Sequence, residues 1–83
     1  MNAIIRAPAA LFVFYDLPMH SATIVDRAVI RLAQTVEGHL EWDPPHQRLR
    51  AGVHDVMLGI DLEAETVTVL RIYRARRPAG HAR

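Results

Sequence analysis

The chain contains no cysteine and no lysine, and none of its apolar runs is long. Without cysteine, disulfides, thiolate metal sites and thiol nucleophiles are excluded. The longest apolar run, residues 7–15, is much shorter than the roughly 20 residues that span a bilayer. The sequence also lacks the basic start and small-residue cleavage site of a signal peptide. We therefore expect a cytoplasmic protein with no membrane partner.

Common catalytic and cofactor motifs are missing too. There is no Gly-x-Ser-x-Gly nucleophile motif and no glycine-rich phosphate-binding loop. None of the five histidines has the spacing of a metal motif such as His-Glu-x-x-His; they are His20, His39, His46, His54 and His81. We expect no metal site and no cofactor.

The length of 83 residues allows one domain, which we place at residues 1–83. A chain of this size buries only about 60–65% of its unfolded surface, so its stability should be modest and a partner would help it. We expect residues 78–83 to form a mobile tail.

The charge is nearly balanced, with ten arginines against nine acidic residues and a net charge of +1. This balance alone argues against a nucleic-acid partner. Five arginines nevertheless lie between residues 71 and 83, where no acidic residue occurs. Arginine makes bidentate contacts with both phosphate and carboxylate. The basic segment therefore suits RNA, DNA or an acidic peptide equally well.

The first half of the chain predicts a short strand at residues 2–6 and then helical structure. Residues 9–17 are ambiguous, because Pro8 suits the first turn of a helix whereas Phe12-Val-Phe-Tyr15 has strand propensity. A second helix is predicted from a cap at Ser21 to Gly38, since apolar residues recur there at helical spacing. Residues 37–47 contain a glycine and two prolines and predict a loop, with Trp42 packed against the body.

The second half predicts an antiparallel meander of three strands, at residues 48–50, 55–61 and 66–72. Val56, Leu58 and Ile60 alternate with residues of the opposite face, so one face of this sheet should be buried. A short acidic turn joins the last two strands. The expected core combines the two halves and consists of Val56, Leu58, Ile60, Val25, Val29 and Leu32.

The order of these segments resembles the RelE/ParE superfamily, the small bacterial toxins of toxin–antitoxin pairs. The segments that carry the resemblance are Leu49-Arg-Ala-Gly52, Val56-Met-Leu-Gly-Ile-Asp61 and Thr66-Val-Thr-Val-Leu-Arg-Ile72, and upstream Pro8-Ala-Ala-Leu11, Asp16-Leu-Pro18 and Ile24-Val-Asp-Arg-Ala-Val-Ile-Arg-Leu-Ala33. The similarity covers roughly residues 3 to 77. It implies an α+β fold with an N-terminal helical hairpin packed on a small antiparallel sheet, and it favours a helix for residues 9–17.

The resemblance also implies a cognate antitoxin as partner and one of two targets. Members of the ParE branch poison DNA gyrase, whereas the RelE branch cuts mRNA on the ribosome by attack of the ribose 2′-hydroxyl, without a metal. Asp55 stands where the ribonucleases carry arginine, the arginine of their last strand falls at or beside Ala75, and their C-terminal tyrosine is missing. The last strand looks more like ParE. We therefore expect a ParE-like toxin that binds a protein target, with two alternatives: a RelE-like endonuclease, or a non-catalytic dimerisation or partner-binding module.

Arginines are the candidate site residues. Arg48, Arg50 and Arg74 match basic positions of the family and are the candidate catalytic groups. The proposed surface for a target or nucleic acid comprises Arg48, Arg50, Arg71, Arg74, Arg76 and Arg77, expected to converge on the solvent-facing side of the sheet, where they could hold a phosphate backbone. Tyr73 or His54 could act as a general acid or base. The simpler alternative is a solvated basic strand end. We expect Asp55 to pair, partly exposed, with Arg48, Arg50 and Arg74 and to weaken their field.

An apolar surface at Leu11, Phe12, Val13 and Phe14 is the candidate partner interface. If residues 9–17 form a helix, it is apolar on nearly all sides and should be covered on both. A bare patch of that kind usually marks an interface. We expect either a second copy of the chain or an antitoxin segment to cover it.

Overall fold

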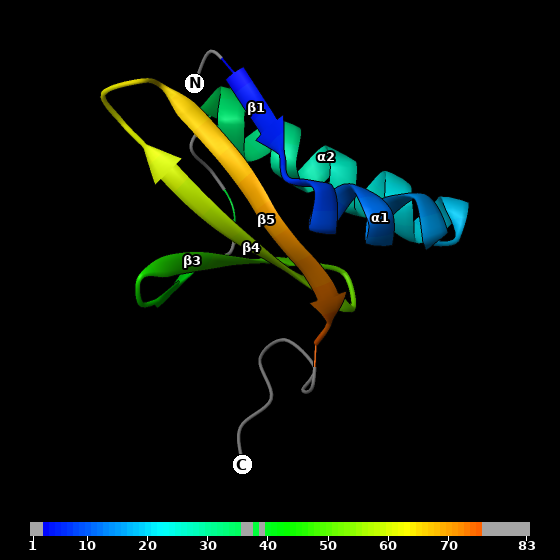
Figure 1. The fold of residues 1–83 in the computed structure, drawn as a ribbon. Coiled ribbons are helices and arrows are strands. Elements are labelled where there is room, and N and C mark those ends of the chain that lie inside the picture. The colour runs from blue at the N-terminus through cyan, green and yellow to red at the C-terminus, as the bar shows by residue number, and fades with distance from the viewer. Residues whose placement is uncertain (1–2, 36–37, 39, 76–83) are drawn as a thin grey trace.

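The computed structural model describes residues 3–35, 38 and 40–75. These residues form two helices and five strands, in the order β1 (Ala3–Arg6), α1 (Pro8–Asp16), α2 (Met19–Thr35), β2 (Leu40–Asp43), β3 (His46–Ala51), β4 (His54–Asp61) and β5 (Thr66–Arg74). Both helices lie on the same side of one sheet (Figure 1). The predicted α+β fold, with an N-terminal helical hairpin on a small sheet, is confirmed.

The sheet has the strand order β1-β5-β4-β3-β2. Neighbouring strands from β2 to β5 are antiparallel, which confirms the predicted meander and extends it by one strand. β1 pairs in parallel with β5, so the sheet is mixed and not purely antiparallel (Figure 1). The loop predicted for residues 37–47 is wrong, because residues 40–43 form edge strand β2 and β3 begins at residue 46. The two prolines lie in the turn between these strands, where they interrupt no strand pairing.

Two prolines set the bounds of the helices. Pro8 begins α1, where its missing N–H costs nothing. Leu17 precedes Pro18 and takes an extended conformation, with φ −74° and ψ 146°, because a following proline disfavours helical geometry; α1 therefore ends at Asp16. The Pro18 carbonyl already accepts a hydrogen bond from the Ala22 N–H. The second helix thus starts earlier than predicted, and Ser21 lies inside it instead of capping it.

The core lies between the helices and the sheet. Leu49 of β3, Val56 of β4 and Ile72 of β5 are buried in one row across the sheet, against Val25, Val29, Leu32 and Ala33 of α2. The predicted core is confirmed except for Ile60, which packs against the core but stays partly exposed. Trp42 is 66% exposed and does not pack against the body as predicted.

An irregularity in β5 determines which side chains face the helices. Met57 pairs with Arg71 and Leu58 pairs with Val69, so Leu70 is an extra residue in β5. A bulge of this kind shifts the alternation of the strand by one position. Val69 before the bulge and Ile72 after it are therefore both buried. The same shift places Arg71 and Tyr73 on the opposite face from Ile72.

Candidate functional site

The face of the sheet directed away from the helices carries most of the polar side chains of β3, β4 and β5. We call it the open face and define it by Arg48, Arg50, Asp55, Met57, Arg71 and Tyr73. The register sets this grouping, because residues directly opposite one another in neighbouring strands share a face. One row across the sheet is Arg50–Asp55–Tyr73, and the next is Arg48–Met57–Arg71.

Arg50 and Asp55 form the best-buried ion pair of the open face among the described residues. The Arg50 Nε donates to Asp55 Oδ1 at 3.0 Å, and the side chains are 18% and 9% exposed. The two residues are direct partners across β3 and β4, so the strand register itself holds them together. The predicted pairing of Asp55 is thus found with Arg50, in a part-buried pair whose carboxylate is buried and whose guanidinium keeps some exposure. Breaking it would leave a charge with little access to water.

Arg48 occupies the more exposed end of the open face. Its guanidinium bonds to the Glu41 carboxylate and lies 4.0 Å from an oxygen of Asp43, both on edge strand β2. The Glu41 bond is the largest influence on the pKa of Arg48 and raises it, desolvation by burial opposes that rise, and the nearby Tyr73 hydroxyl raises the pKa further. Arg48 is 35% exposed and Glu41 55%, so their pair contributes only about 0–1 kcal/mol.

Arg48 and Tyr73 come from strands that do not pair with each other. Arg48 belongs to β3 and Tyr73 to β5, and β4 lies between them. The two side chains therefore meet over β4, next to Asp55, which is the direct partner of Tyr73. This arrangement accounts for the burial of Asp55, 7% exposed on a face that no described helix covers.

The charges of this cluster nearly cancel. Arg48 and Arg50 stand against the carboxylates of Glu41, Asp43 and Asp55, and Arg71 lies exposed on the same face. Sequence reasoning placed Asp55 here but missed Glu41 and Asp43, because residues 37–47 were assigned to a loop. The alternation Leu40-Glu-Trp-Asp43 was the signal of a strand whose acidic residues share a face.

The remaining candidate residues do not join this cluster. Arg74 pairs with His54, and by alternation from Ile72 both belong to the helix side of the sheet, so Arg74 does not converge with Arg48 and Arg50 as predicted. His54 is only 9% exposed and has no place beside the open-face arginines. Arg76 and Arg77, like the predicted tail 78–83, lie outside the described residues.

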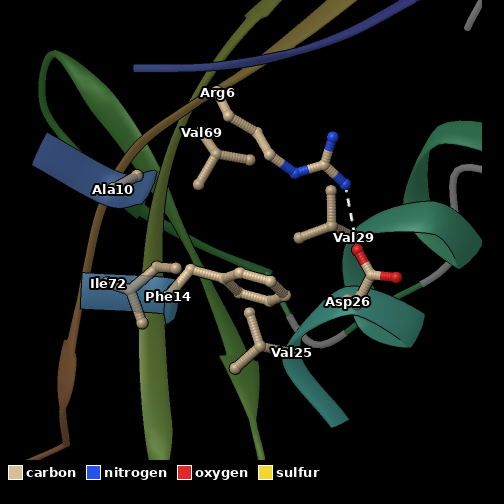
Figure 2. Close-up of a pocket in the computed structure, with 8 residues that line it drawn as sticks. All are labelled: Arg6, Ala10, Phe14, Val25, Asp26, Val29, Val69 and Ile72. Atoms are coloured by element: carbon tan, nitrogen blue, oxygen red, sulfur yellow. Dashed lines mark hydrogen bonds and ion pairs between the residues drawn. The ribbon is translucent and has the colours of Figure 1, made fainter. Parts of the chain in front are cut away.

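The described residues form neither a metal site nor a second catalytic cluster. No group of three or more histidine or acidic side chains in the described ranges could hold a metal ion. Figure 2 shows a small hollow between α1, α2 and β5, with Arg6 reaching from β1 to bond Asp26 Oδ1 at 2.9 Å. The rest of its lining is apolar, namely Ala10, Phe14, Val25, Val29, Val69 and Ile72. The ionisable groups of the hollow are Arg6 and Asp26, which are paired with each other.

The apolar surface predicted on α1 is only partly exposed. Val13 and Phe14 pack against the core, and Leu11 is half-buried. Phe12 is 82% exposed, as are Tyr15 at 78% on the same helix and Met19 at 83% at the start of α2; sequence reasoning had not assigned Tyr15 or Met19 to an exposed surface. We call Phe12 and Tyr15, which lie three residues apart on one side of α1, the helical apolar patch. No helix of the described part of the chain is long and apolar enough to cross a membrane.

Comparisons with known proteins place the fold. No protein-family model matches the sequence, and no curated protein is significantly similar to it. The structure is similar to the isolated RelE toxin of E. coli, with a TM-score of 0.73 and 14% identity over 95% of this chain and 89% of that chain. The structure is also similar to that of the intact E. coli RelBE toxin–antitoxin complex, with a TM-score of 0.73 and 15% identity over 93% of this chain and 100% of that chain. For the archaeal RelE–RelB complex of Pyrococcus horikoshii OT3 the TM-score is 0.71, with 12% identity over 92% of this chain and 97% of that chain.

These similarities show that the chain has a RelE-like fold. The sequence-based resemblance to the RelE/ParE superfamily is therefore confirmed at the level of fold. The proteins it matches here are RelE proteins, so these comparisons do not support the expected preference for the ParE branch.

Proposed function

We propose that this protein is the toxin of a type II toxin–antitoxin pair and that it acts in the RelE manner, on mRNA at the ribosome. The main support is the combination of a RelE-like fold over nearly the whole chain with Arg48, Arg71 and Tyr73 on the open face of its sheet. The proposal reverses the preference drawn from the sequence. That preference rested on Asp55, Ala75, the missing C-terminal tyrosine and the last strand, whereas the fold comparison covers nearly the whole chain.

The chemistry of the open face suits a metal-independent reaction. Guanidinium groups such as those of Arg48 and Arg71 can hold a backbone phosphate and stabilise the charge that develops on it. The Tyr73 hydroxyl lies near Arg48 and has a proton to donate. The carboxylates beside Arg48 and Arg50 reduce the positive field, so we expect cleavage to be slow.

Induced expression in bacteria tests this function. We expect growth arrest, with mRNA cut only while it is being translated, and relief of the arrest when the antitoxin encoded beside the gene is co-expressed. Arg48→Ala should reduce cleavage about 10²-fold, because it removes a group that stabilises the transition state. Glu63→Ala, an exposed change in the turn between β4 and β5, is the matched control and should cut normally. Normal growth of bacteria that express the unmodified protein would contradict the proposal.

A second candidate is binding of a protein target in the ParE manner. The observation that favours it is the near-neutral charge of the open face, in which Arg48 and Arg50 already bond to carboxylates of the same chain. A phosphate backbone requires uncompensated positive charge. Growth arrest accompanied by DNA damage, with intact mRNA, would favour this candidate over the first.

The helical apolar patch predicts where the antitoxin binds. Large exposed aromatic side chains are frequent anchors of protein interfaces, and Phe12 and Tyr15 are both mostly exposed. We expect Phe12→Ala combined with Tyr15→Ala to weaken antitoxin binding at least about tenfold, measured by calorimetry, with unchanged thermal stability. Leu62→Ala, at an equally exposed apolar residue of another surface, is the control. Loss of self-association in light scattering, with antitoxin binding unchanged, would assign the patch to a second copy instead.

A further inference from the structure

We propose that the two open-face arginines have separate roles: Arg50 is a structural anchor, Arg48 is the cation that binds an RNA phosphate, and Glu41 is an internal competitor that the phosphate must displace. The inference rests on the proposed function for its choice of RNA as ligand. It concerns the regulation of that site by a neighbouring carboxylate of the same chain.

Burial separates the two arginines. The Arg50 and Asp55 side chains are 18% and 9% exposed, and their residues are direct partners in the register of β3 and β4. The Arg50 Nε–H is bonded to a carboxylate that has almost no access to water, so this donor and much of the positive charge of Arg50 are not available to a phosphate. Arg50 is therefore held as part of the sheet and presents little of its charge to a ligand.

Arg48 differs in each of these respects. It is 35% exposed, and its carboxylate partners, Glu41 and Asp43, are 55% and 43% exposed. Both acids lie on β2, an edge strand of the sheet. Exposed pairs of this kind are weak and are screened by salt. A backbone phosphate carries one negative charge, as a carboxylate does, and its two non-bridging oxygens accept bonds from a guanidinium, so it can take the place of Glu41 at this exposed position.

The competition predicts that removing the Glu41 charge strengthens RNA binding. Glu41→Gln keeps the size of the side chain but leaves Arg48 without its closest negative charge. We expect the affinity for a short, fluorescently labelled single-stranded RNA to rise about three- to tenfold, with a steeper salt dependence by about 0.7 in the log–log slope, as for one additional phosphate contact. Asp43→Asn should give a smaller rise, since Asp43 lies 4.0 Å from Arg48.

Controls separate local competition from overall charge. Glu63→Gln makes the same change in net charge in the exposed turn between β4 and β5, and should alter RNA affinity by less than about twofold. In an Arg48→Ala background, Glu41→Gln should have no further effect, because the competition no longer has a cation. Fluorescence anisotropy on the purified full chain measures all of these affinities, and thermal melts confirm folding.

Two results would overturn the inference. One is an equal effect of Glu41→Gln and Glu63→Gln, and the other is a Glu41→Gln effect that persists without Arg48. Neither outcome depends on ribosomes or on growth arrest. A failed growth-arrest experiment would contradict the proposed function and leave the competition between Glu41 and RNA phosphate testable on its own.

Discussion

Leu58→Ala is expected to lower the free energy of unfolding by about 3–4 kcal/mol, the range found when a fully buried leucine is truncated and its cavity does not collapse. Leu58 is 0% exposed in β4 and pairs with Val69 of β5, directly beside the bulge. A domain of this size has a total stability of only about 4–12 kcal/mol. The substitution therefore removes a large part of the stability of the fold.

Urea unfolding followed by far-ultraviolet circular dichroism measures this loss. Leu62→Ala makes the same chemical change at a residue that is 76% exposed, so it should alter stability by no more than about 0.5 kcal/mol. Fluorescence of Trp42 is a poorer probe, because this side chain is already largely exposed in the folded state. Similar losses for the two leucine variants would contradict the burial of the Leu58 side chain in the core between the sheet and the helices.

The elements with regular periodicity were predictable from the sequence. Alternation in β4 and helical spacing in α2 each gave both the type of element and its buried face, and the structure confirms both. The ambiguity at residues 9–17 was resolved by the family resemblance, since Pro8 and strand-favouring aromatics point in opposite directions. Edge strand β2 was missed because two prolines and a glycine near it indicate a loop, and its four residues are too few for alternation to outweigh them.

The candidate site was predictable in composition but not in geometry. Simple alternation along β5 puts residues 67, 69, 71 and 73 on one face, whereas the bulge at Leu70 moves Arg71 and Tyr73 to the other. A one-residue insertion of this kind depends on pairing with β4 and leaves no local sequence pattern. For the same reason the sequence placed Arg74 with Arg48 and Arg50, although its strand position assigns it to the helix side.

The burial of Asp55 changes what substitutions there can show. If Asp55 were partly exposed, as the sequence predicted, Asp55→Arg would increase salt-sensitive RNA binding without creating strong cleavage. In the structure, a second guanidinium would lie against Arg50 in a place that is 7% exposed. We now expect this substitution to destabilise the fold before it alters binding.

Arg50→Ala is accordingly expected to cost about 2–3 kcal/mol of unfolding free energy, because it leaves the buried Asp55 carboxylate without its guanidinium partner. Asp55→Ala should cost a similar amount for the converse reason. The double variant Arg50→Met with Asp55→Leu removes both charges and fills the space. Its free energy of unfolding should therefore lie within about 1 kcal/mol of that of the original protein. Arg71→Ala, on the same face but exposed, is the control and should cost less than about 0.5 kcal/mol. Urea denaturation measures the free energy of unfolding of these four variants and of the original protein. If Arg50→Ala is as mild as Arg71→Ala, the pair is not a structural anchor, and both arginines would then be available to a ligand.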